Sequence, residues 1–199
     1  MIKHVIFDLG NVLIEIHPEE AMGEFAERCN YSQEQITAFY LSDLHLGFME
    51  GKYTPEQFFH KLRELYPCDI SQQEFYEIWQ KVIGRPKQGV IELIEDLKKK
   101  YILSVCSNTD PWHWSVVWKR DTFLRDFKYF FLSFEMKLNK PDPQVFQTIL
   151  QKLNARGDEC VFVDDSPVNI EVANRFGFWG ILGNEPKTIR NEMEKLQIL

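Results

Sequence analysis

The chain has no long hydrophobic run, few cysteines and fewer basic than acidic residues, 23 Lys and Arg against 30 Asp and Glu. Its 199 residues contain no stretch approaching the ~18 consecutive apolar residues of a membrane-spanning helix. The amino terminus, MIKHVIFDLG, lacks the long apolar segment and small-residue cleavage site of a secretory signal. A net charge of -7 without a local Lys/Arg-rich stripe disfavours binding to nucleic acid, although small anionic ligands stay open. We therefore expect a cytoplasmic protein that binds neither membranes nor nucleic acid.

The cysteines are too few and too scattered to indicate a metal site or a disulfide framework. Cys29, Cys68, Cys106 and Cys160 share no short spacing. Two of them, Cys106 and Cys160, lie inside apolar runs, where a thiol behaves as a small hydrophobic side chain. We therefore expect all four cysteines to be reduced and structural.

A hydrophobic fraction of 44%, with 14% aromatic residues, suffices for one sizeable core with or without a smaller insert. Five short apolar runs predict strands buried on both faces, as in a parallel sheet covered by helices. Amphipathic stretches at 89–100 and 143–153, and capping residues before proline at 110–111, 142–143 and 166–167, predict those helices. The pattern is typical of a doubly wound α/β domain with a Rossmann-like parallel sheet. The five runs are HVIF (4–7), YILSVC (101–106), YFFLS (129–133), CVFV (160–163) and WGIL (179–182).

Residues 18–84 do not follow this alternation of strands and helices. They show helical patterns throughout, without a convincing strand. The simplest account is a helical insert after the first strand, with the chain returning near GRPKQG (84–89). We predict an α/β core domain of residues 1–17 and 85–199 and a helical domain of residues 18–84. The expected helices lie near 18–29, 33–46, 55–65 and 72–83.

Polar side chains follow four of the predicted strands, and an open parallel sheet binds its ligands at the carboxyl ends of the strands. Asp164 and Asp165 stand out, because two adjacent carboxylates repel each other unless a cation balances them. Their oxygen atoms suit Mg²⁺, above all if Asp8 faces them across adjacent strands. The alternative is that the pair only caps the following helix. The full set is Asp8 and Gly10, then Ser107, Asn108 and Thr109, then Lys140, then Asp164, Asp165 and Ser166.

The second and third groups of this set allow two interpretations. Ser107, Asn108 and Thr109 are ordinary turn residues before a helix, and most lysines, such as Lys140, are solvated. In the functional interpretation, a hydroxyl and an amide point at phosphate oxygens near a helix start. Lys140, held in a proline-braced turn, then supplies the positive charge that a phosphate needs.

The order of these residues along the chain is more specific than any of them alone. It resembles the haloacid dehalogenase (HAD) superfamily of hydrolases across nearly the whole chain. The segments FDLGNVL, CSNT and VFVDDSPVNIEVAN are most similar to bacterial sugar-phosphate phosphatases of the α-D-glucose-1-phosphate phosphatase kind, and more distantly to the phosphatase domain of soluble epoxide hydrolase. The resemblance implies the HAD fold, with residues 18–84 as its cap domain, and a Mg²⁺-dependent phosphatase of a small organic phosphate.

Carried over residue by residue, the resemblance makes Asp8 the nucleophile that takes the phosphoryl group as an aspartyl-phosphate. It implies that Asp8, the main-chain carbonyl of Gly10 and Asp165 hold Mg²⁺, with Asp164 helping through a water molecule. The implied partner is a small phosphorylated metabolite, and a sugar 1-phosphate is the first candidate.

The same resemblance implies a phosphate-binding set. Ser107, Asn108 and Lys140 would hold the phosphoryl oxygens, and Lys140 would also offset the charge of Asp8. Such a site provides what phosphoryl transfer needs physically, which is positioning of the reacting groups together with distributed positive charge.

Position 10 departs from the superfamily's pattern, in which the residue two after the nucleophile is a second Asp that protonates the leaving oxygen. Gly10 keeps a main-chain carbonyl for the metal but lacks the acid, a loss that typically costs about 10²–10⁴-fold in rate. Three interpretations stay open: a substrate whose leaving group departs easily, a surrogate acid at Glu15 or His17, or a catalytically weak or inactive phosphate-binding or regulatory protein. A phosphomutase needs the missing acid and a dehalogenase needs no metal, so the sequence disfavours both.

The sequence does not decide which residues of the helical insert determine the substrate. Four of its polar residues are candidates to face the cleft, and each would be equally ordinary on a solvated helix. These residues are Asp43, His45, Glu50 and Lys52. Trp112, Trp114 and Trp118 recur at helical intervals, which favours packing over a sugar-stacking platform; a dimer contact, and with it the choice between monomer and homodimer, stays open.

Overall fold

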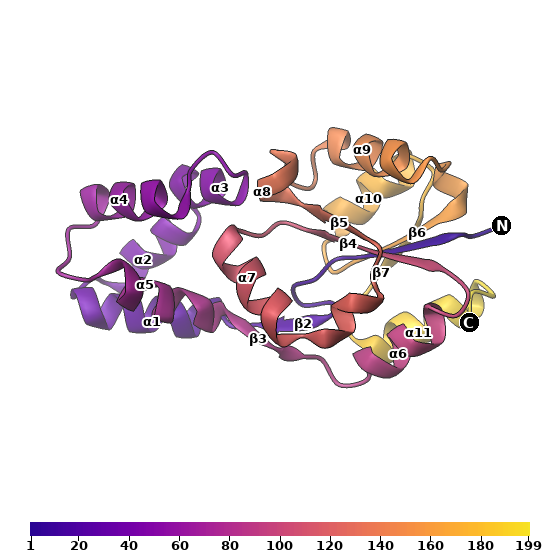
Figure 1. The fold of residues 1–199 in the computed structure, drawn as a ribbon, viewed down its shortest axis with the longest axis horizontal. Helices are drawn as coiled ribbons and strands as arrows, with labels where there is room; N and C mark the ends of the chain where they lie inside the picture. The colour runs from indigo at the N-terminus through magenta and orange to yellow at the C-terminus, as the bar shows by residue number, and fades with distance from the viewer.

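The computed structural model describes residues 1–199 and has a five-stranded parallel sheet, which lies in the right-hand part of Figure 1. Its strands are β1 (His4–Phe7), β4 (Ile102–Ser107), β5 (Tyr129–Leu132), β6 (Cys160–Asp164) and β7 (Trp179–Leu182). The spatial order is β5-β4-β1-β6-β7, so the first strand lies in the middle. Phe7 at the end of β1 pairs with Val105 of β4 and Val163 of β6. The sheet confirms the predicted parallel α/β fold, and its register brings the ends of β4, β1 and β6 together.

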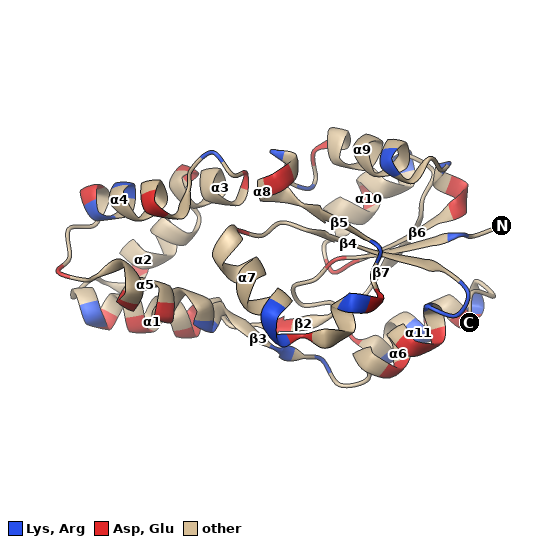
Figure 2. Ribbon diagram, viewed as in Figure 1, with Lys and Arg blue, Asp and Glu red and all other residues tan.

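Five helices cover the sheet: α6 (Val90–Leu97), α7 (Pro111–Arg120), α9 (Pro143–Leu153), α10 (Pro167–Arg175) and α11 (Pro186–Lys195). Because side chains alternate along a strand, Val5 and Phe7 of β1 pack toward α6, α7 and α11, whereas Ile6 packs toward α9 and α10. Figure 2 shows the charged residues concentrated on the helices, while the strands are mostly uncharged. Burial on both faces explains why the strands appear in the sequence as continuous apolar runs.

Two of the three predicted caps begin their helices as expected. The Asp110 carboxylate accepts hydrogen bonds from two main-chain N–H groups of the first turn of α7, and the Asp142 carboxylate accepts one at the start of α9. Ser166 is different, because its side chain makes no capping bond before α10. Its own N–H donates instead to the carboxylate of Asp164, at 2.9 Å.

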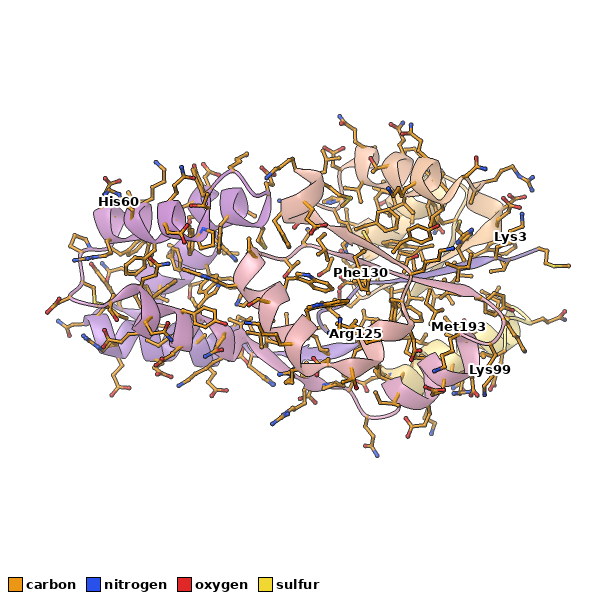
Figure 3. All side chains as sticks on the ribbon, viewed as in Figure 1. Lys3, His60, Lys99, Arg125, Phe130 and Met193 are labelled. Atoms are coloured by element: carbon orange, nitrogen blue, oxygen red, sulfur yellow. A yellow bond between two sulfur atoms is a disulfide. The ribbon has the colours of Figure 1, made fainter.

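The segment 18–84 forms five helices that lie beyond the carboxyl ends of the parallel strands, at the left of Figure 1. They are α1 (Pro18–Cys29), α2 (Gln33–Tyr40), α3 (Asp43–Met49), α4 (Pro55–Leu65) and α5 (Gln72–Trp79). The predicted single helix at 33–46 is two helices, because Ser42 caps a new one. A separate aromatic core joins the five, including Phe25, Phe39, Phe58 and Trp79. Figure 3 shows His60 of α4 on the outer side of this bundle.

A short two-stranded sheet links the two parts of the chain, and the sequence did not predict it. β2 (Ile14–Ile16) and β3 (Ile83–Pro86) pair antiparallel where the chain leaves and re-enters the α/β part. β3 begins inside the segment expected to hold no strand. Strands of three and four residues are too short to show an alternating pattern. The division into domains 1–17 with 85–199 and 18–84 stays a prediction.

The prediction of four reduced cysteines is wrong for two of them. Cys29, at the end of α1, and Cys68, before α5, form a disulfide, whereas Cys106 and Cys160 are buried free thiols. The pair is 39 residues apart, so only the fold of α1 against α5 brings it together. Disulfides are typical of oxidising compartments, and this one does not support the expected cytoplasmic location, which stays a prediction. No helix combines the length and the apolar character needed to cross a bilayer.

The three tryptophans of α7 all take part in packing. Trp112 lies with the aromatic core of the helical segment, with its ring 5.4 Å from that of Phe48. Trp114 and Trp118 stack on each other at 5.7 Å and contact Phe130 of β5. Helix α7 therefore packs against the sheet, but it places the side chain of Trp112 against the core of the helical segment.

Candidate functional site

The candidate site lies where β1, β4 and β6 end. The main-chain N–H of Asp8 donates to the carbonyl of Val163 at 2.8 Å, which fixes Asp8 at the tip of the central strand. Ser107 and Asp164 are the last residues of the strands on either side. A cavity of about 280 Å³ opens at this edge, and Asp8, Gly10 and Ser107 are among its lining residues.

Three carboxylates meet at the cavity. One oxygen atom each of Asp8, Asp164 and Asp165 lies within 4.8 Å of the others. Asp164 is fully buried, Asp8 is buried and Asp165 is partly exposed. Closely spaced carboxylate oxygens, one of them open to the cavity, fit a hard divalent cation such as Mg²⁺. The predicted metal ligands are thus gathered in one place, with Gly10 in the same lining.

Lys140 sits between two of these carboxylates. Its Nζ donates to Oδ1 of Asp8 and to Oδ2 of Asp164, both at 2.7 Å, and its side chain is only 3% exposed. Burial raises the pKa of Asp8 to about 6; Lys140 opposes that rise and Asp164 adds to it. Burial alone would lower the pKa of Lys140, but the two carboxylates outweigh burial and raise it. The lysine therefore stays charged and partly compensates the acidic cluster.

Asn108 holds the segment that carries Lys140. Its Oδ1 accepts the main-chain N–H of Lys140 at 2.8 Å, and its Nδ2 donates to the Lys140 carbonyl at 2.9 Å. The amide that the sequence assigns to phosphate is thus engaged on both sides with the main chain of Lys140. One N–H of its Nδ2 remains for a ligand, because an amide nitrogen carries two.

The buried member of the acidic pair is held from several sides. Oδ1 of Asp164 accepts from the N–H of Ser166 and from Nδ2 of Asn169, each at 2.9 Å. Asp164 therefore orders the start of α10, as the capping interpretation proposed, while its other oxygen binds Lys140. The next residue, Asp165, lines the cavity.

The position without an acid has room for a Cβ atom. A Cβ built on Gly10 would meet only the side chain of Ile16, at 3.4 and 3.8 Å, which is ordinary van der Waals contact. The proposed surrogates are placed elsewhere. Glu15 and His17 lie at the link between the two parts, with side chains 50% and 41% exposed, and neither lines the cavity.

The helical segment supplies the wall opposite the acidic cluster. Among the polar residues proposed from that segment, only His45 lines the cavity. Glu50 instead accepts a hydrogen bond from Asn139 and pairs with Lys52. The sequence missed Tyr40 as a second polar lining residue, because only the packing of α2 against α3 turns it toward the cavity.

A buried ion pair behind this wall joins the two parts of the molecule. Asp110 accepts from Trp79 Nε1 at 3.0 Å and contacts His113 Nδ1 at 2.8 Å, while His113 Nε2 lies 2.9 Å from the Trp79 carbonyl. Both ring nitrogens of His113 face oxygen acceptors, so the ring is held as an imidazolium. Burial would lower the pKa of His113, but Asp110 outweighs burial and raises it. His113 lines the cavity and was also missed by sequence.

Residues 2–177 match the family model of haloacid dehalogenase-like hydrolases. A D-ribitol-5-phosphate phosphatase of Bacteroides thetaiotaomicron is 24% identical over 185 residues, which cover 89% of this chain and 90% of that protein. A phosphorylated carbohydrates phosphatase of Thermotoga maritima is 28% identical over 194 residues, covering 90% and 83%. The crystal structure of a HAD family enzyme from Bacteroides thetaiotaomicron, in complex with magnesium and inorganic phosphate, matches with a TM-score of 0.84 at 29% identity over 92% of this chain and 94% of that one.

Proposed function

The chain belongs to the haloacid dehalogenase-like hydrolases, and we propose that it is a Mg²⁺-dependent phosphatase of a small phosphorylated metabolite. The observation that carries the proposal is the buried Lys140, shared by Asp8 and Asp164 beside the third carboxylate of Asp165. The similarity to two phosphatases that are named for phosphorylated carbohydrates supports the substrate class. The related enzyme in complex with magnesium and phosphate supports the cofactor.

In this proposal Asp8 is the nucleophile. One of its carboxylate oxygens bonds to phosphorus while the bond from phosphorus to the leaving oxygen breaks, which gives an aspartyl-phosphate and an alkoxide that takes a proton from water to become the alcohol. Water then attacks the phosphorus, releases inorganic phosphate and restores the carboxylate. With a pKa of about 6, Asp8 is mostly ionised at neutral pH, as a nucleophile must be.

Mg²⁺ would be held by Asp8, Asp165 and the carbonyl of Gly10, with Asp164 acting through water. It would supply positive charge that offsets the charge of the phosphoryl group. Lys140 adds a second fixed charge without requiring a metal.

Ser107 and Asn108 would complete the phosphate site. Ser107 is buried at the end of β4 and lines the cavity, and its hydroxyl forms no hydrogen bond with another protein group. We assign Asn108 two tasks, a contact to the phosphoryl group through its free N–H and the positioning of Lys140 through its two main-chain bonds. The helical segment 18–84 would act as the cap domain that closes the site.

The leading substrate is a sugar phosphate, with a sugar 1-phosphate as first candidate, because an anomeric oxygen needs little help from an acid to depart. The alternative is a catalytically weak phosphate-binding protein on the same fold. Asp8 and Lys140 argue against the alternative, since a site that only binds phosphate gains nothing from a carboxylate aimed at it.

The test is release of phosphate from a panel of sugar phosphates and p-nitrophenyl phosphate, with Mg²⁺ or with EDTA. We expect release that EDTA abolishes and that falls at least about 10³-fold in Asp8→Asn, with an unchanged melting temperature. If no substrate is hydrolysed while phosphate ligands still raise the melting temperature, the phosphatase proposal is wrong and the binding protein is favoured.

A further inference from the structure

The two ends of the cavity differ in charge. Three charged side chains of the lining, Asp8, Lys140 and Asp165, lie at the strand ends. The lining also contains His113, whose charge is balanced by Asp110. The wall from the helical segment and the link is apolar except for Tyr40 and His45. Its apolar members are Ile14, Ile16, Met49, Val82 and Ile83. A ligand with its phosphate at the strand ends therefore places its other end among neutral groups.

His45 presents a defined hydrogen-bonding atom to this neutral end. Its Nδ1 lies 2.7 Å from the main-chain carbonyl of Tyr40. Because a carbonyl oxygen only accepts, Nδ1 carries the proton. Burial lowers the pKa of His45, which favours the neutral ring. Nε2 is then an acceptor, and it has no protein donor and is not fully enclosed, which leaves it open to the cavity that His45 lines.

The ring of His45 cannot easily turn away from the cavity. It packs edge-on against Trp79 at 5.0 Å and against the ring of Tyr40 at 4.7 Å, and the residue is 3% exposed. The Tyr40 hydroxyl also has no protein partner, and burial raises the pKa of Tyr40 to about 12, so it stays a donor. An oriented acceptor and a phenolic donor thus stand together in an otherwise apolar wall.

Resting on the proposed function, we propose that His45 is a specificity-determining residue whose Nε2 accepts a hydrogen bond from a hydroxyl group of a phosphorylated substrate whose carbon chain is uncharged and polyhydroxylated. Tyr40 assists with its hydroxyl. A site built to pair with a hydroxyl discriminates against an analogue that lacks it, because its own polar atom is then left buried without a partner. The cavity of about 280 Å³ must also hold the phosphate, which favours a short carbon chain such as that of a pentitol or a small sugar.

The experiment compares D-ribitol 5-phosphate with n-pentyl phosphate, which has the same chain length without hydroxyl groups. His45→Asn places an amide N–H where Nδ1 bonds the Tyr40 carbonyl but removes the Nε2 acceptor. His45→Gln instead places an amide oxygen near the position of Nε2. Asp43→Asn, on the exposed start of the same helix and outside the cavity, is the matched control.

We expect the wild type to favour the pentitol phosphate and His45→Asn to lower that preference in kcat/KM about tenfold, the effect of one lost hydrogen bond. His45→Gln should retain most of the preference, and Asp43→Asn all of it. Equal losses on both substrates would indicate a structural role and overturn the proposal. An unchanged ratio, or a wild type without any preference, would also overturn it.

The dissociation constants of both ligands and of inorganic phosphate, measured by calorimetry, separate this inference from the phosphatase proposal. Binding without turnover would refute the phosphatase, while the ratio of the two ligands' dissociation constants would still test His45. If both enzymes hydrolyse the substrates and the ratio of the two kcat/KM values is the same in the wild type and in His45→Asn, only the role of His45 is refuted. If His45→Asn fails to fold by circular dichroism, Tyr40→Phe gives the second test, with an expected threefold to tenfold loss of the same ratio.

Discussion

The strand ends and the helical segment form opposite walls of one cavity by different physical means. At the strand ends, Asp8, Lys140 and Asp164 hold one another through charged hydrogen bonds of 2.7 Å. In the helical segment, aromatic rings pack around Trp79, and the disulfide of Cys29 and Cys68 ties α1 to the loop before α5. The groups suited to chemistry and those suited to recognition therefore rest on separate supports, so each can be changed with limited effect on the other.

The two walls are nevertheless fastened together at two places. On one side, Asp110 and His113, at the start of α7, form hydrogen bonds with Trp79 of α5. On the other, the Ser133 hydroxyl lies 2.7 Å from the carbonyl of Met49, and Lys137 donates to the carbonyl of Gly51. Any movement of the helical segment away from the strand ends would have to break contacts on at least one side.

The largest effect is expected from Lys140→Met, which acts at the strand ends alone. Removing the lysine leaves Asp8 and Asp164 buried without their cation, which should cost about 3–5 kcal/mol of stability in the absence of metal. Phosphatase activity should fall at least about 10³-fold, because the variant loses the positive charge of Lys140 that would stabilise the phosphoryl group during transfer. Melting curves with EDTA and kcat/KM with Mg²⁺ measure the two effects. Lys99→Met, an exposed surface change, is the control, and an active, stable Lys140→Met enzyme would contradict the site as described.

The second-largest effect is expected from removing the disulfide, and it should be confined to the helical segment. Replacing Cys29 and Cys68 by serine removes a cross-link that closes a loop of about 40 residues, and loop entropy predicts a loss of about 4 kcal/mol. Urea unfolding with and without reductant measures it, and reductant should affect the wild type alone. The dissociation constant of inorganic phosphate should not change, because its ligands lie on the other wall. A weakened phosphate affinity would show that the two supports are not separate.

Asp110→Asn tests the fastening between the walls. The amide keeps an oxygen for the first turn of α7 but leaves the imidazolium of His113 without its counter-charge, which should cost about 3 kcal/mol. His113 loses the partner that raises its pKa, so in the variant it should titrate at lower pH, as NMR of the ring would report. A variant as stable as the wild type would mean that the pair does not hold the walls together. Glu92→Gln, on an exposed position of α6, is the control.

The two walls also differ in how far the sequence predicts them. Asp8, Ser107, Lys140 and Asp164 follow apolar runs, and a parallel sheet must bring the ends of such runs to one edge. Nothing local marks Tyr40 or His113, whose place depends on how α2, α3 and α7 pack. The disulfide, the pairing of β2 with β3 and the engagement of Asn108 with Lys140 are likewise long-range contacts without a short-range signal.

The smallest effect, a gain, is expected from Gly10→Asp. The glycine has no strained conformation to protect, and the new Cβ would touch only two methyl groups of Ile16 at van der Waals distance, so the chain should accept the side chain. If the missing proton donor limits the reaction, hydrolysis of D-ribitol 5-phosphate, whose alkoxide leaves poorly, should rise on the order of tenfold. p-Nitrophenyl phosphate should gain little, since its leaving group needs no proton. Gly10→Asn has the same shape but cannot donate a carboxyl proton, so an equal gain in that variant would attribute the effect to packing. A loss on both substrates would mean that a fourth carboxylate disturbs the charge balance that Lys140 maintains at the strand ends.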